Sequence, residues 1–199
     1  MSTRLILIRH GSTDWSMKKK YCSFTDIDLN NKGKNEARKL YQRLNKERIH
    51  KVYSSDAKRA FHFAKIAIRG LTIEKIPELR ELNFGIFEGL SYREIIKRYP
   101  EIYTRWLNDP FGVDIPSGES LCNFKKRVSK ILKRINSLNR NKTIAIVTHA
   151  GPIKIIVNDI LKSKKIWEIT PDLASLNIID FKNGKGKIQL FNDTSYLNG

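Results

Sequence analysis

Short apolar runs alternate with amphipathic segments along this chain, and this alternation constrains the fold more than any other feature. The runs that predict buried strands are 5–8, 50–54, 71–76 and 143–148, and the segments that predict helices are 34–48, 57–69 and 119–138. Pro152 stands where the first turn of a further helix is expected. Two more strands, 177–181 and 187–191, flank the turn-forming pair Asn183-Gly184. Strands that alternate with helices form mostly parallel sheets, so we expect an α/β three-layer sandwich with helices on both faces of a central sheet.

The segment 77–118 departs from this alternation. It contains four prolines, several aromatic residues and a single clear helix signal. Ser91 and Glu94 have the spacing of a capping box, which predicts a helix that starts at Ser91 and ends near Pro100. We expect a lid-like insertion over the carboxyl ends of the strands, within one domain that spans 1–199.

Cationic and titratable residues gather at the predicted strand ends. The first strand ends in Arg9-His10-Gly11, and the strand 143–148 is followed by His149. Arg59 falls in the first turn of the helix that follows the strand 50–54. In such sheets ligands bind beyond the carboxyl ends of the strands. Two histidines, two arginines and helix N-termini at one edge predict an anion site, for which phosphate fits best. We expect Gly11 to let the chain turn away tightly behind the histidine.

Familiar phosphate, hydrolase and metal motifs are missing from the sequence. It contains no Gly-x4-Gly-Lys-Ser/Thr loop, no Cys-x5-Arg, no Gly-x-Ser-x-Gly and no His or Cys pairs at ligand spacing. Cys22 and Cys122 are far apart and are expected to be unpaired thiols. A histidine nucleophile remains, because a neutral imidazole can attack phosphorus and form a covalent intermediate. No metal and no cofactor are expected.

Several segments resemble the histidine phosphatase superfamily, which has the phosphoglycerate-mutase-like fold. They are RHGSTDW, VYSSDAKRA, LRELNFGIFEGLSYREI, SGESL and VTHAGPIK. The resemblance implies that His10 is the phosphorylated nucleophile and that Glu81 donates a proton to the leaving group. It also implies that Arg9, Arg59 and His149 bind the phosphoryl group.

The chain differs from the family in its first loop. Ser16 stands where the family usually has Asn, and Cys22-Ser23 replace its usual Gln-Gly or Thr-Gly. These positions line the substrate entrance in relatives, so Ser16, Cys22 and Ser23 are expected to contact the substrate. The segments YPEIYTRWLNDP and PSGESL also resemble the α-ribazole phosphatases of cobalamin biosynthesis. Only 36 residues separate Glu81 from Gly118, and this shortness favours a phosphatase over a mutase.

Three functions follow as expectations. The first is hydrolysis of a small phosphorylated metabolite through phosphohistidine, with α-ribazole 5′-phosphate among the candidate substrates. The second is a cofactor-dependent phosphoglycerate mutase. The third is a non-catalytic protein that binds polyanions or nucleic acid. The net charge of +18 is the reason to consider it, because such a charge attracts anions. The basic residues are spread along the chain, so nucleic acid is not expected as a partner. We also expect a cytoplasmic monomer or homodimer without membrane attachment.

Overall fold

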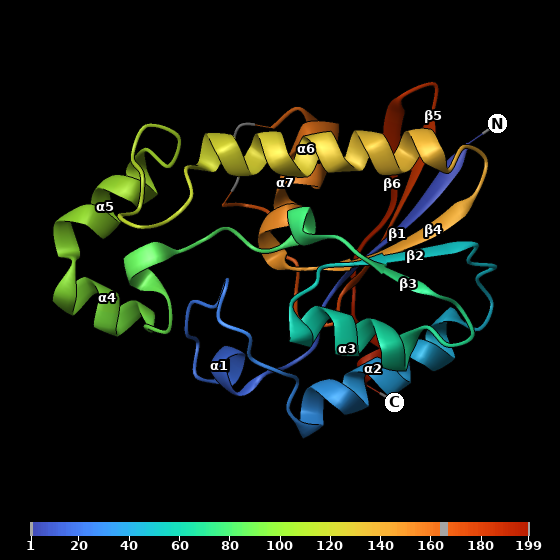
Figure 1. Ribbon diagram of the computed structural model, residues 1–199, viewed down its shortest axis with the longest axis horizontal. Coiled ribbons are helices and arrows are strands. Elements are labelled where there is room, and N and C mark those ends of the chain that lie inside the picture. Colours follow the sequence, from blue (N-terminus) through green and yellow to red (C-terminus); the bar gives the residue numbers. More distant parts are fainter. Residues whose placement is uncertain (1, 164–166, 199) are drawn as a thin grey trace.

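The computed structural model describes residues 2–163 and 167–198 and is built on one six-stranded sheet (Figure 1). The strands are β1 (Thr3–Arg9), β2 (Lys51–Ser54), β3 (Ile73–Lys75), β4 (Thr143–Thr148), β5 (Leu176–Lys182) and β6 (Lys185–Asp193). Their order in the sheet is β3-β2-β4-β1-β5-β6. The first four strands in this order are parallel, whereas β5 runs antiparallel to β1 and to β6. The expected mostly parallel sheet is confirmed.

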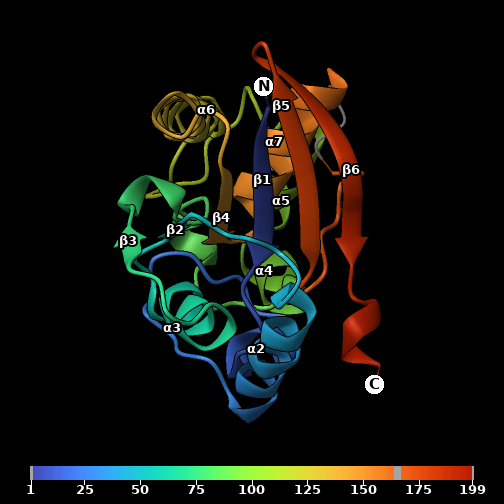
Figure 2. The same ribbon diagram turned by 90° about the vertical axis from the view of Figure 1, so that its right-hand side faces the viewer.

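Seven α-helices accompany the sheet within the described residues. They are α1 (Asp14–Met17), α2 (Asn31–Leu44), α3 (Lys58–Ala67), α4 (Tyr92–Arg98), α5 (Pro100–Asn108), α6 (Leu121–Leu138) and α7 (Ala150–Leu161). Three 3-10 turns cover Pro77–Leu79, Gly85–Phe87 and Ser195–Leu197. Seen along the sheet, α6 and α7 lie on one side, and α2 and α3 lie on the other (Figure 2). No helix among the described residues is long and apolar enough to cross a membrane.

The central strands are apolar on both faces, and successive residues serve opposite layers. In β1, Leu5 and Leu7 join the hydrophobic cluster of α6 and α7, while Ile6 and Ile8 join that of α2 and α3. All four side chains are fully buried. A strand covered on both faces reads as a continuous apolar run rather than as an alternation, which is the pattern that identified β1 and β4 in the sequence.

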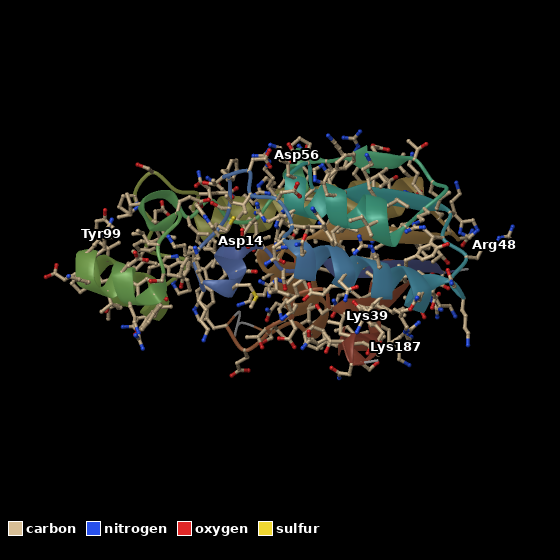
Figure 3. The ribbon with its side chains drawn as sticks, turned by 90° about the horizontal axis from the view of Figure 1, so that it is seen from below. Asp14, Lys39, Arg48, Asp56, Tyr99 and Lys187 are labelled. Carbon is tan, nitrogen blue, oxygen red and sulfur yellow. The ribbon has the colours of Figure 1, made fainter. Side chains whose placement is uncertain are left out.

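The insertion 77–118 lies beyond the carboxyl ends of the strands, at one end of the molecule. In Figure 3, Tyr99 of the insertion and Arg48 at the amino ends of the strands lie at opposite ends, with Asp14 and Asp56 between them. Phe87, Ile95, Tyr103 and Trp106 are buried in the same hydrophobic cluster that contains Phe124 of α6. The insertion therefore shares its core with one layer of the sandwich.

Local signals in the sequence explain the start of α4 and the turn between β5 and β6. Ser91 caps α4, and the Glu94 carboxylate accepts hydrogen bonds of 2.8 Å from both the Ser91 backbone and its hydroxyl, so the expected capping box is confirmed. Asn183 and Gly184 both have positive φ, as a two-residue hairpin turn of the primed type requires.

Two helices were not expected. α5 begins at Pro100, where the sequence suggested only the end of α4. Proline suits the first turn of a helix as well as it stops the preceding one, since its missing N–H has no intrahelical partner at that position. The short α1 follows Thr13, which caps it through a hydrogen bond from the Ser16 backbone. The helix expected at 34–48 begins earlier, after the Asn30 cap, and ends at Leu44.

Because the insertion shares the core, replacing Trp106 with Ala is expected to destabilise the whole described fold by about 3–5 kcal/mol. Leu107→Ala is the matched control, because Leu107 is exposed and its loss is expected to change stability by less than about 0.5 kcal/mol. Urea unfolding followed by far-UV circular dichroism measures both variants. A W106A variant whose main transition stays at the wild-type midpoint would show that the insertion folds separately.

Candidate active site

The sheet brings the two predicted histidines together. β1 and β4 are parallel neighbours in which Arg9 pairs with Thr148, so His10 and His149 leave their strands at the same level. Their ring centroids are 5.1 Å apart, and the rings meet edge to face. β2 lies on the other side of β4, and Ser55, which follows it, is 2.9 Å from Nε2 of His149 through its hydroxyl oxygen. Three adjacent strand ends therefore build the floor of the site.

His10 is buried and is held as a neutral imidazole. Burial lowers its pKa well below the usual 6.5, and the positive charges of Arg59 and Arg9 lower it further. Its Nδ1 lies 2.8 Å from the main-chain oxygen of Gly11. A carbonyl oxygen can only accept, so Nδ1 carries the proton and Nε2 keeps a free lone pair. This is the state in which an imidazole is a nucleophile.

Gly11 is required for space and not for an unusual backbone angle. It is absent from the residues of positive φ. A Cβ atom at this position would lie 2.6 Å from the ring of Phe63 and 2.7 Å from the carboxylate of Glu36. That carboxylate accepts hydrogen bonds from the backbone and hydroxyl of Ser12, at 2.7 and 2.8 Å. The glycine thus lets the turn after His10 approach α2 closely, which adds a reason of space to the tight turn expected from the sequence.

Arg59 and Arg9 surround His10, and each retains an unused donor. Arg59 is 1% exposed, and its terminal nitrogens donate to the main-chain oxygens of Cys22, Ser23 and Thr25. Arg9 donates to the carbonyl of Pro171 at 2.7 Å. The Nε atoms of both arginines are buried without a hydrogen-bond partner, and so is Nδ1 of His149. We call Arg9, His10, Arg59 and His149 the inner pocket.

Unsatisfied buried nitrogens of this kind are costly and normally have a partner. A tetrahedral oxyanion placed beside His10 can accept from both guanidinium groups. Burial and the positive charge of Arg59 also lower the pKa of His149 well below its usual value. The inner pocket therefore combines positive charge with buried nitrogens that lack partners, an arrangement suited to an anion such as a phosphoryl group.

Glu81 faces the same cavity from the start of the insertion. Its carboxylate accepts from the Leu82 backbone at 2.9 Å and from the Gly151 backbone at 3.0 and 3.1 Å. Gly151 has no room for a side chain, because a Cβ atom would lie 2.0 Å from that carboxylate. The first turn of α7 therefore fixes the acid group.

Arg127 of α6 holds the backbone on which Glu81 is mounted. Its guanidinium donates to the main-chain oxygens of Glu78, Arg80 and Glu81, at 2.7 to 3.3 Å. Glu119 orients it through paired hydrogen bonds of 2.9 and 2.6 Å. Bidentate geometry of this kind fixes both position and direction.

A cavity of about 470 Å³ opens from the inner pocket, and Arg9, His10, Arg59 and Glu81 line its inner part. Lys19, Lys20, Tyr21, Phe84, Asp172 and Leu173 line the same cavity, and we call the part that they line the outer cavity. No group of three or more His, Cys, Asp or Glu side chains in residues 2–163 and 167–198 is arranged to hold a metal ion.

The three expected substrate-contacting residues have different positions. Ser16 and Cys22 line the cavity, whereas Ser23 does not. The hydroxyl of Ser16 is engaged with the Thr13 backbone. Ser23 is fully buried, donates its hydroxyl to Glu88 and accepts from Arg59 through its carbonyl, so it supports the inner pocket from behind. Burial raises the pKa of the Cys22 thiol to about 11, which keeps the thiol protonated at neutral pH.

Sequence reasoning missed several residues of the site. Ser55 lies in a strand end that the sequence singled out, but nothing assigned it a partner. Arg127 looks like one of many lysines and arginines on a basic helix, and Asp172 lies in a loop without a motif. Lys19 and Lys20 belong to a short basic run whose ordinary interpretation is a solvated surface.

Comparisons with known proteins agree with this geometry. Residues 5–194 match the family model of the histidine phosphatase superfamily, branch 1. The chain is 36% identical over 200 residues to phosphoglycerate mutase-like protein 4 of Arabidopsis thaliana, covering 97% of this chain and 86% of the relative. It is 31% identical over 198 residues to phosphoserine phosphatase 1 of Hydrogenobacter thermophilus, covering 98% and 94%.

The fold is also similar to that of solved structures. The crystal structure of the α-ribazole phosphatase from Shigella flexneri superposes with a TM-score of 0.88 at 27% identity, covering 96% of each chain. The match to the family model spans nearly the whole chain, and the two strand-end histidines, the two arginines and the insertion carboxylate lie within it. The chain is therefore a phosphatase of the histidine phosphatase superfamily, branch 1.

Proposed function

We propose that the protein hydrolyses a small phosphorylated metabolite through a covalent intermediate on His10. The observation that carries this proposal is the inner pocket. A neutral imidazole with a free Nε2 stands among buried guanidinium and imidazole nitrogens that lack partners. Such a pocket binds a phosphoryl group and presents a nucleophile to it at the same time.

The first step transfers the phosphoryl group to the enzyme. Nε2 of His10 attacks phosphorus, the bond to the ester oxygen breaks, and Glu81 gives its proton to that oxygen. Arg9 and Arg59, with His149, face the equatorial oxygens, where negative charge spreads in the transition state. Because these donors are fixed beforehand, they need no reorganisation when the charge develops.

The second step returns the enzyme to its starting state. Water attacks the phosphohistidine, the N–P bond breaks, and inorganic phosphate leaves. Glu81, now ionised, takes a proton from that water, which restores its acid form for the next substrate. The same carboxyl group thus acts as acid and then as base.

The identity of the phosphorylated metabolite is itself part of what we propose. Relatives are named for phosphoserine and for α-ribazole phosphate, so both compounds are candidates. A mutase differs in outcome, because it isomerises phosphoglycerate and releases little inorganic phosphate.

Replacing His10 with Ala is expected to abolish phosphate release while the fold persists, because His10 supplies the nucleophile and the role of His149 is to bind the equatorial oxygens. Wild-type protein mixed with substrate and quenched should carry an acid-labile phosphoryl group that H10A lacks. His50→Ala is the matched control, since His50 is exposed and outside the cavity. All assays contain EDTA. Substantial turnover by H10A, or a rate that depends on added metal, would contradict the mechanism.

Glu81→Gln is expected to slow hydrolysis of alkyl phosphates by about 10²–10⁴-fold, because an alkoxide needs a proton to leave. Hydrolysis of p-nitrophenyl phosphate should fall much less, since nitrophenolate leaves without one. Glu78→Gln, at an exposed carboxylate nearby, serves as control and should change neither rate. Equal losses for both substrates in E81Q would remove Glu81 from the role of proton donor.

The lowered pKa of His10 sets the sign of its pH dependence. Protonation consumes the Nε2 lone pair, so the nucleophile is present above the pKa and is lost as the pH falls through it. With that pKa well below 6.5, the ring of His10 should remain neutral throughout the range from neutrality to pH 6.5. NMR titration of imidazole-labelled protein, assigned with H10A, measures this. A midpoint at or above 6.5 would contradict the electrostatics described here.

A further inference from the structure

The outer cavity carries charges that the phosphoryl chemistry does not use. Lys19 and Lys20 lie in the loop after α1, while Asp172 comes from the loop before β5. All three line the cavity that leads to His10. Among the described residues, none of these three side chains forms an ion pair within 4 Å.

The two lysines are held in place through their backbones. The Lys19 amide donates to the Ser16 carbonyl at 3.1 Å, and the Lys20 amide donates to the Trp15 carbonyl at 3.0 Å. Lys19 has a left-handed backbone with φ of 51°, a conformation that glycine or asparagine adopts more readily. The turn itself therefore does not account for a lysine at this position.

Neither lysine side chain forms an ion pair among the described residues, although the Glu94 carboxylate interacts electrostatically with Lys20. The Lys20 ammonium lies 5.7 Å from the centroid of the Trp15 ring, and its charge lowers the pKa of Glu94 in α4, although the two hydrogen bonds from Ser91 lower that pKa more. Lys19 is exposed. Together they place positive charge in the lining of the cavity that contains His10.

Asp172 is fixed by a chain of amide side chains. Its carboxylate accepts from the side chain of Asn192 at 2.8 Å, and its backbone donates to the same Asn192 side chain at 2.7 Å. The Asn192 backbone donates to the side chain of Asn177 at 2.8 Å, and Asn177 donates to the carbonyl of Leu7 in β1 at 3.0 Å. A carboxylate is thus anchored to the strand that carries the nucleophile.

A carboxylate near a phosphate site repels the substrate's phosphoryl group, and an ammonium group on the substrate would offset that repulsion. We propose that the outer cavity recognises an O-phosphorylated amino acid, with Lys19 and Lys20 binding its carboxylate and Asp172 its ammonium group. This inference rests on the proposed phosphatase activity and names the substrate class of the same site. It assigns the three residues to specificity, not to the phosphoryl transfer.

A different role for Asp172 must be separated from this one. Burial lowers the pKa of Arg9, and the charges of Glu81 and Asp172 raise it again. If Asp172 served only Arg9, its loss would slow every substrate alike. If it binds ammonium, kcat/KM falls only for substrates that carry an ammonium group.

Four small phosphomonoesters separate the two charges. Phosphoserine carries a carboxylate and an ammonium group, 3-phosphoglycerate only the carboxylate, phosphoethanolamine only the ammonium, and glycerol 3-phosphate neither. kcat/KM is measured for all four on wild type, on the double variant K19Q/K20Q and on Asp172→Asn. Lys18→Gln and Asp114→Asn are matched controls, because both residues are exposed and outside the cavity. p-Nitrophenyl phosphate reports the chemistry alone.

Wild type should prefer phosphoserine. The kcat/KM of K19Q/K20Q should fall about tenfold or more for phosphoserine and 3-phosphoglycerate only, as expected for a lost hydrogen bond between charged groups. Asp172→Asn should lose about tenfold on phosphoserine and phosphoethanolamine, and 3-phosphoglycerate should be unchanged or improved. The control variants should match wild type.

Other results would overturn the inference in distinguishable ways. Equal kcat/KM values for the four esters, or a higher value for α-ribazole 5′-phosphate than for phosphoserine, would show that the outer cavity does not select an amino acid. A uniform loss in Asp172→Asn would assign that residue to Arg9. Failure to hydrolyse even p-nitrophenyl phosphate would overturn the proposed phosphatase activity, and the inference with it.

Discussion

Arg59 is a buried cation without a carboxylate partner among the described residues, and the rest of the site compensates for it. A buried charge is unfavourable unless other groups satisfy it. Here the compensation comes from main-chain oxygens of the loop 22–25, and Glu88 in turn holds that loop by accepting from the backbones of Ser23 and Thr25. These contacts leave the Nε atom of Arg59 without a hydrogen-bond partner. The pocket therefore forms around a buried cation that is only partly satisfied by the protein itself.

The same cation sets the chemistry of the histidines. An arginine beside an imidazole disfavours the imidazolium, and burial acts in the same direction. The positive charge that suits this pocket to an anion thus also keeps the His10 imidazole deprotonated. The Glu81 carboxylate has a support of its own, because the turn at Gly151 and the clamp of Arg127 and Glu119 fix its position.

How much of the structure could be predicted from the sequence depends on whether the interaction is local in the chain. Buried strands and strand-end residues were predictable, because apolar runs and polar junctions are local patterns, and β4 was placed at its observed bounds, Thr143–Thr148. Glu81 needed the resemblance to a family, since several carboxylates nearby are equivalent by composition. Ser23 was expected in the cavity and lies behind it, because sequence does not show which way a loop residue points. Arg127 donates to main-chain oxygens that lie at least 46 residues away in the sequence, and Asp172 accepts from a side chain 20 residues away. No local sequence pattern reveals contacts over such separations. Pro100 shows a further difficulty, because one residue both ends α4 and begins α5.

The pairing of β1 with β4 has a consequence for how such a protein can change over evolutionary time. The register that aligns Arg9 with Thr148 also fixes the spacing of the two imidazoles. A slip of one residue in either strand would turn every side chain of that strand to the opposite layer, so these strands tolerate almost no insertion or deletion. The outer cavity is built from loops, where substitutions leave the register untouched. Descendants of one ancestor can therefore acquire new substrates by altering loop residues, while the distance between His10 and His149 is inherited unchanged.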